Sequence, residues 1–436
     1  MKVFCAKDYT LLQGLPGTGK TYTLAFVARL LAAHGRRVLI TSYTHAAVDN
    51  VVLKLMESGL ASTYDASGLP PLVRIGQRSS CHLDVRPVMV SELARNLDRK
   101  TANGESRGVK GKNFANEGTI DDSELPSASS LRTVVSSARI VCISALSVPR
   151  SPLLTGETFD VVIVDEAGQI SQPAIIGALM VADSFVLVGD HLQLPPLVNS
   201  EIAELGGEFF LTFNRSKLGI TQYFLTHFKG YGVSMLKRLA ERFPVSIAQL
   251  TYQYRMHEDI CRISSEAVYG GKLKCGNEAV RRRRLDLPDF PKSLPRAISR
   301  KVYHWLLGTI NPNKSVVFVD TDNIKKLPGA KTGPPSDPVA SKKEGIDPLE
   351  GTVGGRSGGS VVNETEAALV RYIVSGLIAT GLPPSSIGVV CPFRAQVRTS
   401  TVSSYPVPIR LSDDYPFTHE LFDSFASWRR TRPSHK

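Results

Sequence analysis

The residues best suited to chemistry lie near the N-terminus, where Gly14-Leu-Pro-Gly-Thr-Gly-Lys-Thr21 fits the pattern G-x-x-x-x-G-K-[ST]. In such a loop, backbone N–H groups surround phosphate oxygens, the lysine reaches the outer phosphates and the last hydroxyl ligates Mg²⁺. The pattern therefore predicts a nucleoside-triphosphate site in which Lys20 contacts phosphate and Thr21 holds Mg²⁺. The other residues expected to line the site are Gly14, Pro16, Gly17, Thr18 and Gly19.

The neighbouring residues predict the elements that must position this loop. Tyr9–Gln13 is typical of a short strand that enters the loop. Thr21–His34 consists of good helix formers, and Gly35 is expected to end that helix. Because the start of the helix would face the loop, its dipole would add to the anion site.

A pair of acidic residues forms the second candidate for chemistry. Asp165 and Glu166 follow the apolar residues of Phe159–Asp165, which are typical of a strand buried on both faces of a parallel sheet. Ligands bind at the carboxyl ends of such strands. We expect Asp165 to hold Mg²⁺ through its water shell, and Glu166 to orient and deprotonate an attacking water.

Two further segments suit nucleotide chemistry. In Val188–Pro196, Gln193 can donate to a γ-phosphate oxygen, although a turn stiffened by proline would give the same residues. In Gln253–His257, Tyr254 can stack on adenine and Arg255 can reach the γ-phosphate across a cleft. Tyr254 as a core residue and Arg255 as a surface ion pair are the alternatives.

Short polar side chains end another predicted strand, Arg37–Ser42. Hydroxyl and imidazole donors at a strand end suit contacts to the phosphate backbone of a single nucleic-acid strand. A helix N-cap is the alternative role for Thr44. The candidates for strand binding are Thr41, Ser42, Thr44 and His45.

Composition narrows the class of protein. The 436 residues carry a formal net charge of +12, which favours polyanionic partners such as nucleic acid but also suits solubility alone. No apolar run is long enough to span a membrane, and the first residues lack a signal-peptide core, so we expect an intracellular protein. The six cysteines are scattered without a C-x-x-C pair, which argues against zinc, iron–sulfur clusters and disulfides.

Alternating strand-like and helix-like segments predict an α/β fold with parallel sheets. We place a first domain at residues 1–243 and a second at 244–399. Irregular loops are expected at about 98–130 and 328–360, and residues 400–436 form an atypical tail. Besides those above, the expected elements are strands at Ile140–Ser144, Phe185–Gly189, Ile247–Leu250, Val316–Asp320 and Ile387–Cys391, and a helix from Glu364 to about Thr380. The run Arg281–Arg284 is either a nuclear-import or phosphate-binding patch or a solvated charge cluster.

Taken in order, these segments resemble the superfamily-1 helicases, in the subgroup with Gln-Tyr-Arg-Met-His and Gly-Asp-x-x-Gln-Leu-Pro-Pro. Within it they are most similar to the helicase half of the eukaryotic DNA replication helicase/nucleases. The residues that carry this similarity include Thr41–His45, Val48–Asn50, Ile163–Ala167, Gln169–Pro173, Leu187–His191 and Asn363–Ala367. The resemblance covers about residues 7–199 and 232–399, apart from the loops.

The resemblance implies two RecA-like domains with ATP and Mg²⁺ between them, the second domain being incomplete in this chain. It implies an ATP-hydrolysing DNA helicase that moves along a single strand in DNA replication and repair. Expected partners are single-stranded or flapped DNA and single-strand-binding and replication proteins, without a membrane. The expected location is the nucleus, with the mitochondrion as the alternative. By position, Pro392-Phe-Arg-Ala-Gln396 resembles the strand-contacting motif of the second domain, which adds Pro392, Arg394 and Gln396 to the candidates.

The sequence departs from the family pattern in several places. The upstream glutamine motif, barrel and iron–sulfur nuclease are not seen, so we expect no iron–sulfur cluster in this chain. The helicase motifs after Gln396, including a second arginine finger, are missing too. Residues 208–229 and the tail after about Ser400 do not follow the pattern, and we interpret them as translated intron or misassigned exon. Since a second domain without its last strands leaves apolar faces uncovered, we expect it to be poorly stable.

Three functions stay open at this point. The first is an ATP-dependent DNA helicase. The second is a chain that binds ATP and nucleic acid without unwinding, because coupling motifs are missing. The third is an RNA-directed helicase of the same subgroup.

Overall fold

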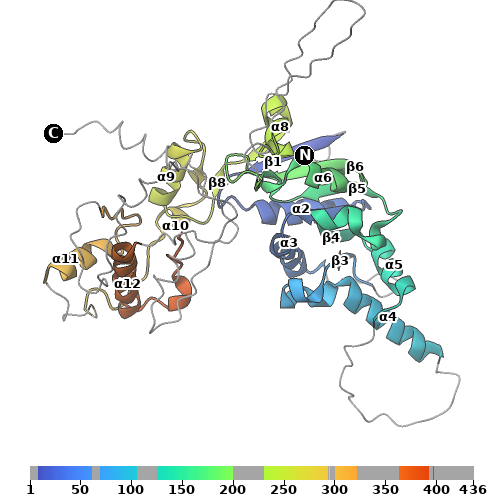
Figure 1. The fold of residues 1–436 in the computed structure, drawn as a ribbon, viewed down its shortest axis with the longest axis horizontal. Helices are drawn as coiled ribbons and strands as arrows, with labels where there is room; N and C mark the ends of the chain where they lie inside the picture. The colour runs from blue at the N-terminus through green and yellow to red at the C-terminus, as the bar shows by residue number, and fades with distance from the viewer. Residues whose placement is uncertain are drawn as a thin grey trace, which may run out of the picture. The chain divides into compact units, whose positions relative to one another are not determined.

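The computed structural model describes residues 8–60, 69–105, 125–199, 230–292, 294, 300–321, 363–391 and 396. The chain divides into two compact units (Figure 1). The first unit comprises Met1–Arg255 and Val268–Asn277, and the second comprises Met256–Ala267 and Glu278–Lys436. The insert predicted at 208–229, the loop at 328–360 and the tail at 400–436 lie outside the described residues.

Within the described residues, a parallel sheet of seven strands forms the centre of the first unit, in the order β3-β4-β2-β5-β6-β1-β7. The α/β class predicted from the sequence is therefore confirmed. The strands are β1 (Tyr9–Gly14), β2 (Val38–Ser42), β3 (Leu72–Arg74), β4 (Ile140–Ser144), β5 (Phe159–Val164), β6 (Ala182–Gly189) and β7 (Ile247–Leu250).

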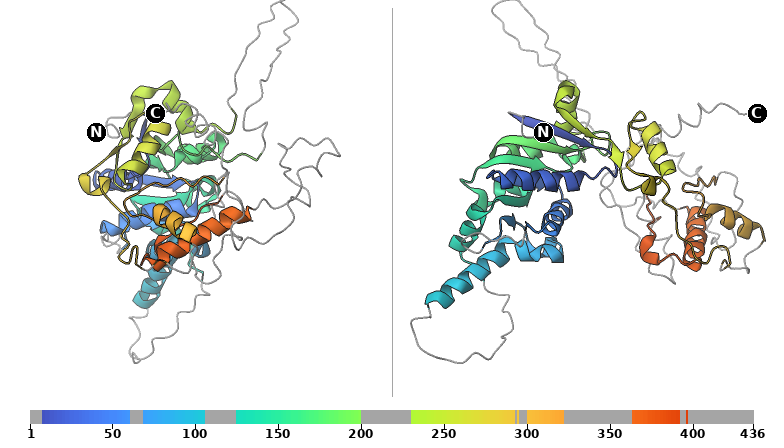
Figure 2. Two further views of the ribbon diagram at one scale, coloured as in Figure 1. Left: turned by 90° about the vertical axis from the view of Figure 1, so that its left-hand side faces the viewer. Right: turned by 180° about the vertical axis from the view of Figure 1, so that it is seen from behind.

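Helices cover both faces of this sheet, because successive strand residues point to opposite faces and both sets are apolar. In β2, Leu39 packs on one face while Val38 and Ile40 pack on the other. One face is covered by α2 (Lys20–Ala33) and α3 (His45–Glu57). The opposite face is covered by α4 (Val90–Glu105), α5 (Ala128–Ser137), α6 (Gln172–Leu179) and α8 (Met235–Arg242) (Figures 1 and 2).

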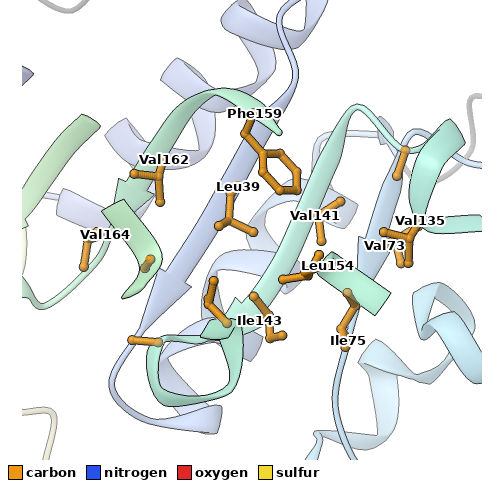
Figure 3. Close-up of a cluster of buried hydrophobic side chains, with 14 of the residues drawn as sticks. Leu39, Val73, Ile75, Val135, Val141, Ile143, Leu154, Phe159, Val162 and Val164 are labelled. Carbon is orange, nitrogen blue, oxygen red and sulfur yellow. The ribbon is translucent and has the colours of Figure 1, made fainter. Parts of the chain in front are cut away.

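The larger of the two apolar layers lies between the sheet and the second set of helices. Figure 3 shows part of this layer, with side chains from β2, β3, β4 and β5 and, outside these strands, Ile75, Val135 and Leu154. Leu39, Val141 and Val162 are fully buried here. Burial of this kind contributes about 1.5–3 kcal/mol for each large apolar side chain, so the layer fixes the strands that carry the site.

Two predictions about the first unit need correction. We expected an irregular loop from about residue 98, but α4 continues to Glu105 and α5 begins at Ala128. We also expected the second domain to begin at residue 244. Instead β7 pairs in parallel with β1, and the first unit extends to Arg255. The apolar side chains of β7 reach the same cores as those of β1, which explains why this strand completes the first sheet.

The described part of the second unit is helical. It contains α9 (Glu258–Ala267), α10 (Glu278–Arg281), α11 (Arg300–Thr309) and α12 (Glu364–Ala379). A small core of Leu294, Leu306 and Ile310 holds α11 against α12. The Asn363 side chain caps α12 by accepting from the N–H of Glu366 at 3.1 Å.

The parallel sheet expected in the second unit is not present in its described residues. Val316–Asp320 and Ile387–Cys391 are described, and neither forms a strand. Phe318 is 81 % exposed and Val390 is 66 % exposed. The apolar pattern predicted strands correctly in the first unit because neighbouring strands complete their hydrogen bonds there. Here the described residues supply no such neighbour.

Candidate functional site

Parallel pairing brings the ends of several strands to one edge of the sheet in the first unit. Thr41 of β2 is level with Val164 of β5, Gln13 of β1 with Gly189 of β6, and Gly14 with Leu250 of β7. The segments that follow these strands carry most of the chemically capable residues predicted from the sequence. This is the edge at which open α/β sheets bind ligands.

The glycine-rich loop links β1 to α2 in a conformation that only glycine adopts readily. Gly17 and Gly19 have φ angles of 73° and 80°, and Gly19 directly precedes the first residue of α2. Thr18 Oγ1 donates to the carbonyl of Leu15 at 2.6 Å, which fixes the turn. The first N–H groups of α2 have no partner within the helix, so loop and helix together form an anion-binding geometry.

Lys20 lies over the start of the loop. An added Cβ at Gly14 would lie 2.1 Å from Lys20 Cγ, so the lysine stem occupies the space that a side chain would need. The Nζ atom of Lys20 lies 3.9 Å from Glu166 Oε1. The structure therefore brings the loop lysine and the second acidic residue together.

The two acidic residues differ in environment. Asp165 is 3 % exposed, and burial followed by the Glu166 carboxylate raises its pKa to about 7, while the Glu166 N–H and Lys20 oppose that rise. Glu166 has a φ of 50°, which makes it the one residue other than glycine with positive φ in the described chain. Such a conformation costs about 1–3 kcal/mol and concentrates at functional sites. A buried carboxylate with a raised pKa suits a cation ligand, and the half-exposed Glu166 suits contact with water.

Asp190, directly after β6, holds the loop that carries Gln193. Its Oδ2 accepts from Gln193 Nε2 at 2.9 Å and from the hydroxyl of Tyr269 at 2.9 Å. Its Oδ1 accepts from the N–H of Leu192 at 3.1 Å and from Gln13 Nε2 at 3.4 Å. Gln193 is thus fixed at the same sheet edge as the loop. Sequence reasoning missed Tyr269, because its partner is 79 residues away and no local pattern marks it.

Tyr254 and Arg255 belong to the first unit and lie against the loop. The N–H of Tyr254 donates to the carbonyl of Gly17 at 2.9 Å, and an added Cβ at Gly17 would lie 2.9 Å from Arg255 Cβ. We expected both residues to follow the first strand of the facing domain. The short strands β8 (Tyr252–Gln253) and β9 (Lys274–Cys275) pair within the first unit and keep them there. Tyr254 is 54 % exposed, so the core alternative is wrong for this residue.

The candidates for strand binding at the end of β2 are less accessible than expected. Thr41 and Ser42 are buried, and their hydroxyls have no hydrogen-bond partner among the described residues. Thr44 caps α3 by accepting from the N–H of Ala47 at 3.2 Å, as the alternative proposed. His45 Nδ1 lies 3.2 Å from Arg74 Nη2. In this structure, the end of β2 therefore presents few accessible hydrogen-bond donors to a nucleic-acid strand.

The candidates in the second unit are only partly described. Pro392 and Arg394 lie outside the described residues. Gln396 is buried and binds the backbone of Asn363 twice: its Oε1 accepts from the N–H at 2.7 Å, and its Nε2 donates to the carbonyl at 2.9 Å. The side chain of Gln396 therefore secures the start of α12.

The arginine run that begins with the last residue of α10 is partly neutralised within the second unit. Arg281 pairs with Glu258 and Glu278, and Arg282 pairs with Glu278 at 2.6 Å. This favours the solvated charge cluster over a phosphate patch. Among the described residues, no group of three His, Cys, Asp or Glu side chains is placed to hold a metal ion, and no helix is long and apolar enough to cross a membrane.

A glycine-rich loop between a parallel strand and a helix, with an acidic pair at the same sheet edge, defines the P-loop class of α/β nucleotide-binding proteins. Two protein-family profiles, each described as an AAA domain, match the chain. One matches residues 2–124 and 98–201, and the other matches 231–402.

Similar proteins specify the class further. The DNA replication ATP-dependent helicase/nuclease DNA2 of Mus musculus is 33 % identical over 403 residues, which cover 91 % of this chain and 30 % of that protein. The protein of the same name from Schizosaccharomyces pombe is 33 % identical over 396 residues, covering 91 % of this chain and 22 % of its own length. This chain thus spans about a third or less of these relatives. It belongs to the superfamily-1 helicases, as the motifs predicted.

Two solved structures are distantly similar to this chain. An arterivirus nonstructural protein 10 helicase in complex with DNA is 12 % identical, covers 62 % of this chain and 42 % of its own, and has a TM-score of 0.31. A structure of Pif1 helicases at forked double-stranded DNA is 13 % identical, covers 57 % of this chain and 46 % of its own, and has a TM-score of 0.19. These likenesses are too small to support a conclusion about this chain.

Proposed function

We propose that this chain is an ATP-dependent DNA helicase motor that hydrolyses ATP at the glycine-rich loop and moves along single-stranded or flapped DNA. The observation that carries the proposal is the convergence of Lys20, Asp165 and Glu166 at one sheet edge. The similarity to DNA replication helicase/nucleases along nine-tenths of the chain supports DNA as the track. Action in DNA replication and repair, in the nucleus and with single-strand-binding and replication proteins, is part of the same proposal.

The residues of the loop fit a nucleoside triphosphate. Left-handed Gly17 and Gly19 leave room for phosphate oxygens close to the backbone, and Lys20 provides a cation at the start of α2. Tyr254 is 54 % exposed and its backbone N–H contacts the loop at Gly17, so we infer that its ring would stack on adenine. Arg255, whose Cβ lies against Gly17, would place its guanidinium near the terminal phosphate.

Mg²⁺ also fits the acidic pair. Thr21 and Asp165 would hold the ion, and a cation would offset the burial and the Glu166 charge that raise the pKa of Asp165. Bound Mg²⁺ would neutralise charge that develops on the phosphates. Glu166 would orient water and accept its proton, since Lys20 draws its carboxylate towards the loop. Gln193 would donate to the terminal phosphate from its position on Asp190.

A second candidate function is supported by the second unit. Val316–Asp320 and Ile387–Cys391 do not form strands in the described part of the chain, and Gln396 is engaged with Asn363. A motor needs a second rigid domain to convert hydrolysis into movement. This observation favours a chain that binds ATP and nucleic acid without unwinding.

Unwinding of a flapped DNA duplex, measured with a fluorophore and quencher on the two strands, tests the proposal. If the chain is a helicase, we expect strand separation that needs ATP and is lost in Lys20→Ala and Glu166→Gln. Glu166→Gln should keep ATP affinity while hydrolysis falls by about 10²-fold or more. ATP-dependent binding without strand separation would support the second candidate instead. Separation of RNA substrates in preference to DNA would identify an RNA-directed enzyme.

A further inference from the structure

Asp190 is a buried residue whose two carboxyl oxygens both accept hydrogen bonds. It is 2 % exposed. Two donors serve each of its oxygens: Leu192 and Gln13 on Oδ1, and Gln193 and Tyr269 on Oδ2. A buried acceptor that loses a donor is destabilised, so each of the four donors matters.

The four donors differ in whether they can leave Asp190. The Leu192 N–H belongs to the turn itself, and Gln13 is held on its other side by Gln249, whose Nε2 donates to Gln13 Oε1 at 3.1 Å. Gln193 is the donor whose amide must turn to phosphate in the proposed function. When it turns, Tyr269 is the donor that stays on Oδ2.

Tyr269 is suited to staying in place. It is 6 % exposed, and burial together with the nearby Asp190 carboxylate raises its pKa, so its hydroxyl keeps the proton that it donates. Tyr269 also lies at a particular point of the chain. The chain leaves the first unit at Arg255, forms α9 in the second unit, and returns to the first unit at Val268. The hydroxyl of Tyr269 ties that return point to the loop of Gln193.

We propose that Tyr269 is a positioning residue for Gln193. Its hydroxyl keeps Asp190 satisfied when Gln193 releases the carboxylate to reach the terminal phosphate. Without that hydroxyl, release would leave Oδ2 buried with no donor, and Gln193 would stay on Asp190. The chain would then lose its preference for a nucleotide that carries a third phosphate. This inference rests on the proposed function and names a residue that no local motif contains.

The test measures the affinity of the purified chain for adenosine 5′-(β,γ-imido)triphosphate and for ADP, both with Mg²⁺. Tyr269→Phe removes only the hydroxyl. We expect the ratio of the two affinities to fall about five- to tenfold, with ADP affinity unchanged. In a Gln193→Ala background the same substitution should leave the ratio unchanged, because no amide is left to release. Tyr231→Phe, on a tyrosine that is 54 % exposed, is the matched control.

Each outcome separates this inference from the function on which it rests. An unchanged ratio in Tyr269→Phe, or an equal fall with and without Gln193, would overturn the positioning role and show a purely structural tyrosine. A lower melting temperature with an unchanged ratio would lead to the same conclusion. Binding of triphosphate that persists in Lys20→Ala would instead overturn the proposed nucleotide site, and the inference with it.

Discussion

Replacement of Gly14 by alanine tests whether the position of Lys20 matters as the structure implies. An added Cβ would lie 2.1 Å from Lys20 Cγ and 2.7 Å from Cδ, whereas ordinary contacts begin at 3.4 Å. The lysine stem must therefore move by more than about 1 Å, and displacement of that size can cost about 10²-fold in rate. A charged hydrogen bond contributes about 1.5–3 kcal/mol, so its loss predicts a fall of roughly 10- to 100-fold in kcat/KM for ATP.

The assay is steady-state ATP hydrolysis at saturating single-stranded DNA, with unfolding in urea as the check on folding. Gly14 does not have a positive φ, so alanine adds no backbone strain and the fold should persist. Gly308→Ala is the matched control, because an added Cβ there meets nothing within 4 Å. Wild-type kcat/KM in a folded Gly14→Ala chain would refute the reasoning about Lys20.

Three other predictions concern stability. Arg74→Met should lower the free energy of unfolding by about 3–5 kcal/mol in urea titrations, because it leaves the buried Asp49 without its cation, which lies 2.8 Å away. The folded metal-free chain holds a proton on Asp165 up to about pH 7, whereas the unfolded chain releases it at about pH 4. The free energy of unfolding should therefore fall as pH rises from about 4 to about 7. In EDTA, the free energy of unfolding of Asp165→Asn should increase relative to that of wild type between pH 5 and pH 8. The same difference between the two proteins at pH 5 and at pH 8 would contradict the raised pKa. Gln396→Ala should speed hydrogen exchange in the first turn of α12, since both bonds to Asn363 are lost.

Local sequence signals were enough to place the loop and the acidic pair. The glycines of the loop, the helix stop at Gly35 and the apolar run before Asp165 each express a short-range constraint. The same reasoning located six of the seven strands of the first sheet, although it assigned Ile247–Leu250 to the second domain. It missed β3, which has only three residues and carries the buried Arg74. Three residues are too few to show an alternation of apolar and polar side chains.

The remaining misses come from contacts between residues far apart in the chain. Tyr254 was placed in the wrong unit because no residue of β7 or β8 shows which sheet it joins; β1 supplies that information through pairing. Tyr269 was missed for the same reason, since only the fold brings it to Asp190. Thr41 and Ser42 were expected to contact a nucleic-acid strand because of their residue types and position, but both are buried. Residue type predicts chemistry, whereas exposure depends on the tertiary structure.

The most direct test of the central claim is the rate of ATP hydrolysis by the purified chain with and without single-stranded DNA. We predict hydrolysis that needs Mg²⁺, rises with added strand, and is lost in both Lys20→Ala and Glu166→Gln, with triphosphate binding kept in the second variant. Hydrolysis at the wild-type rate in Lys20→Ala would contradict the assignment of this loop as the catalytic nucleotide site.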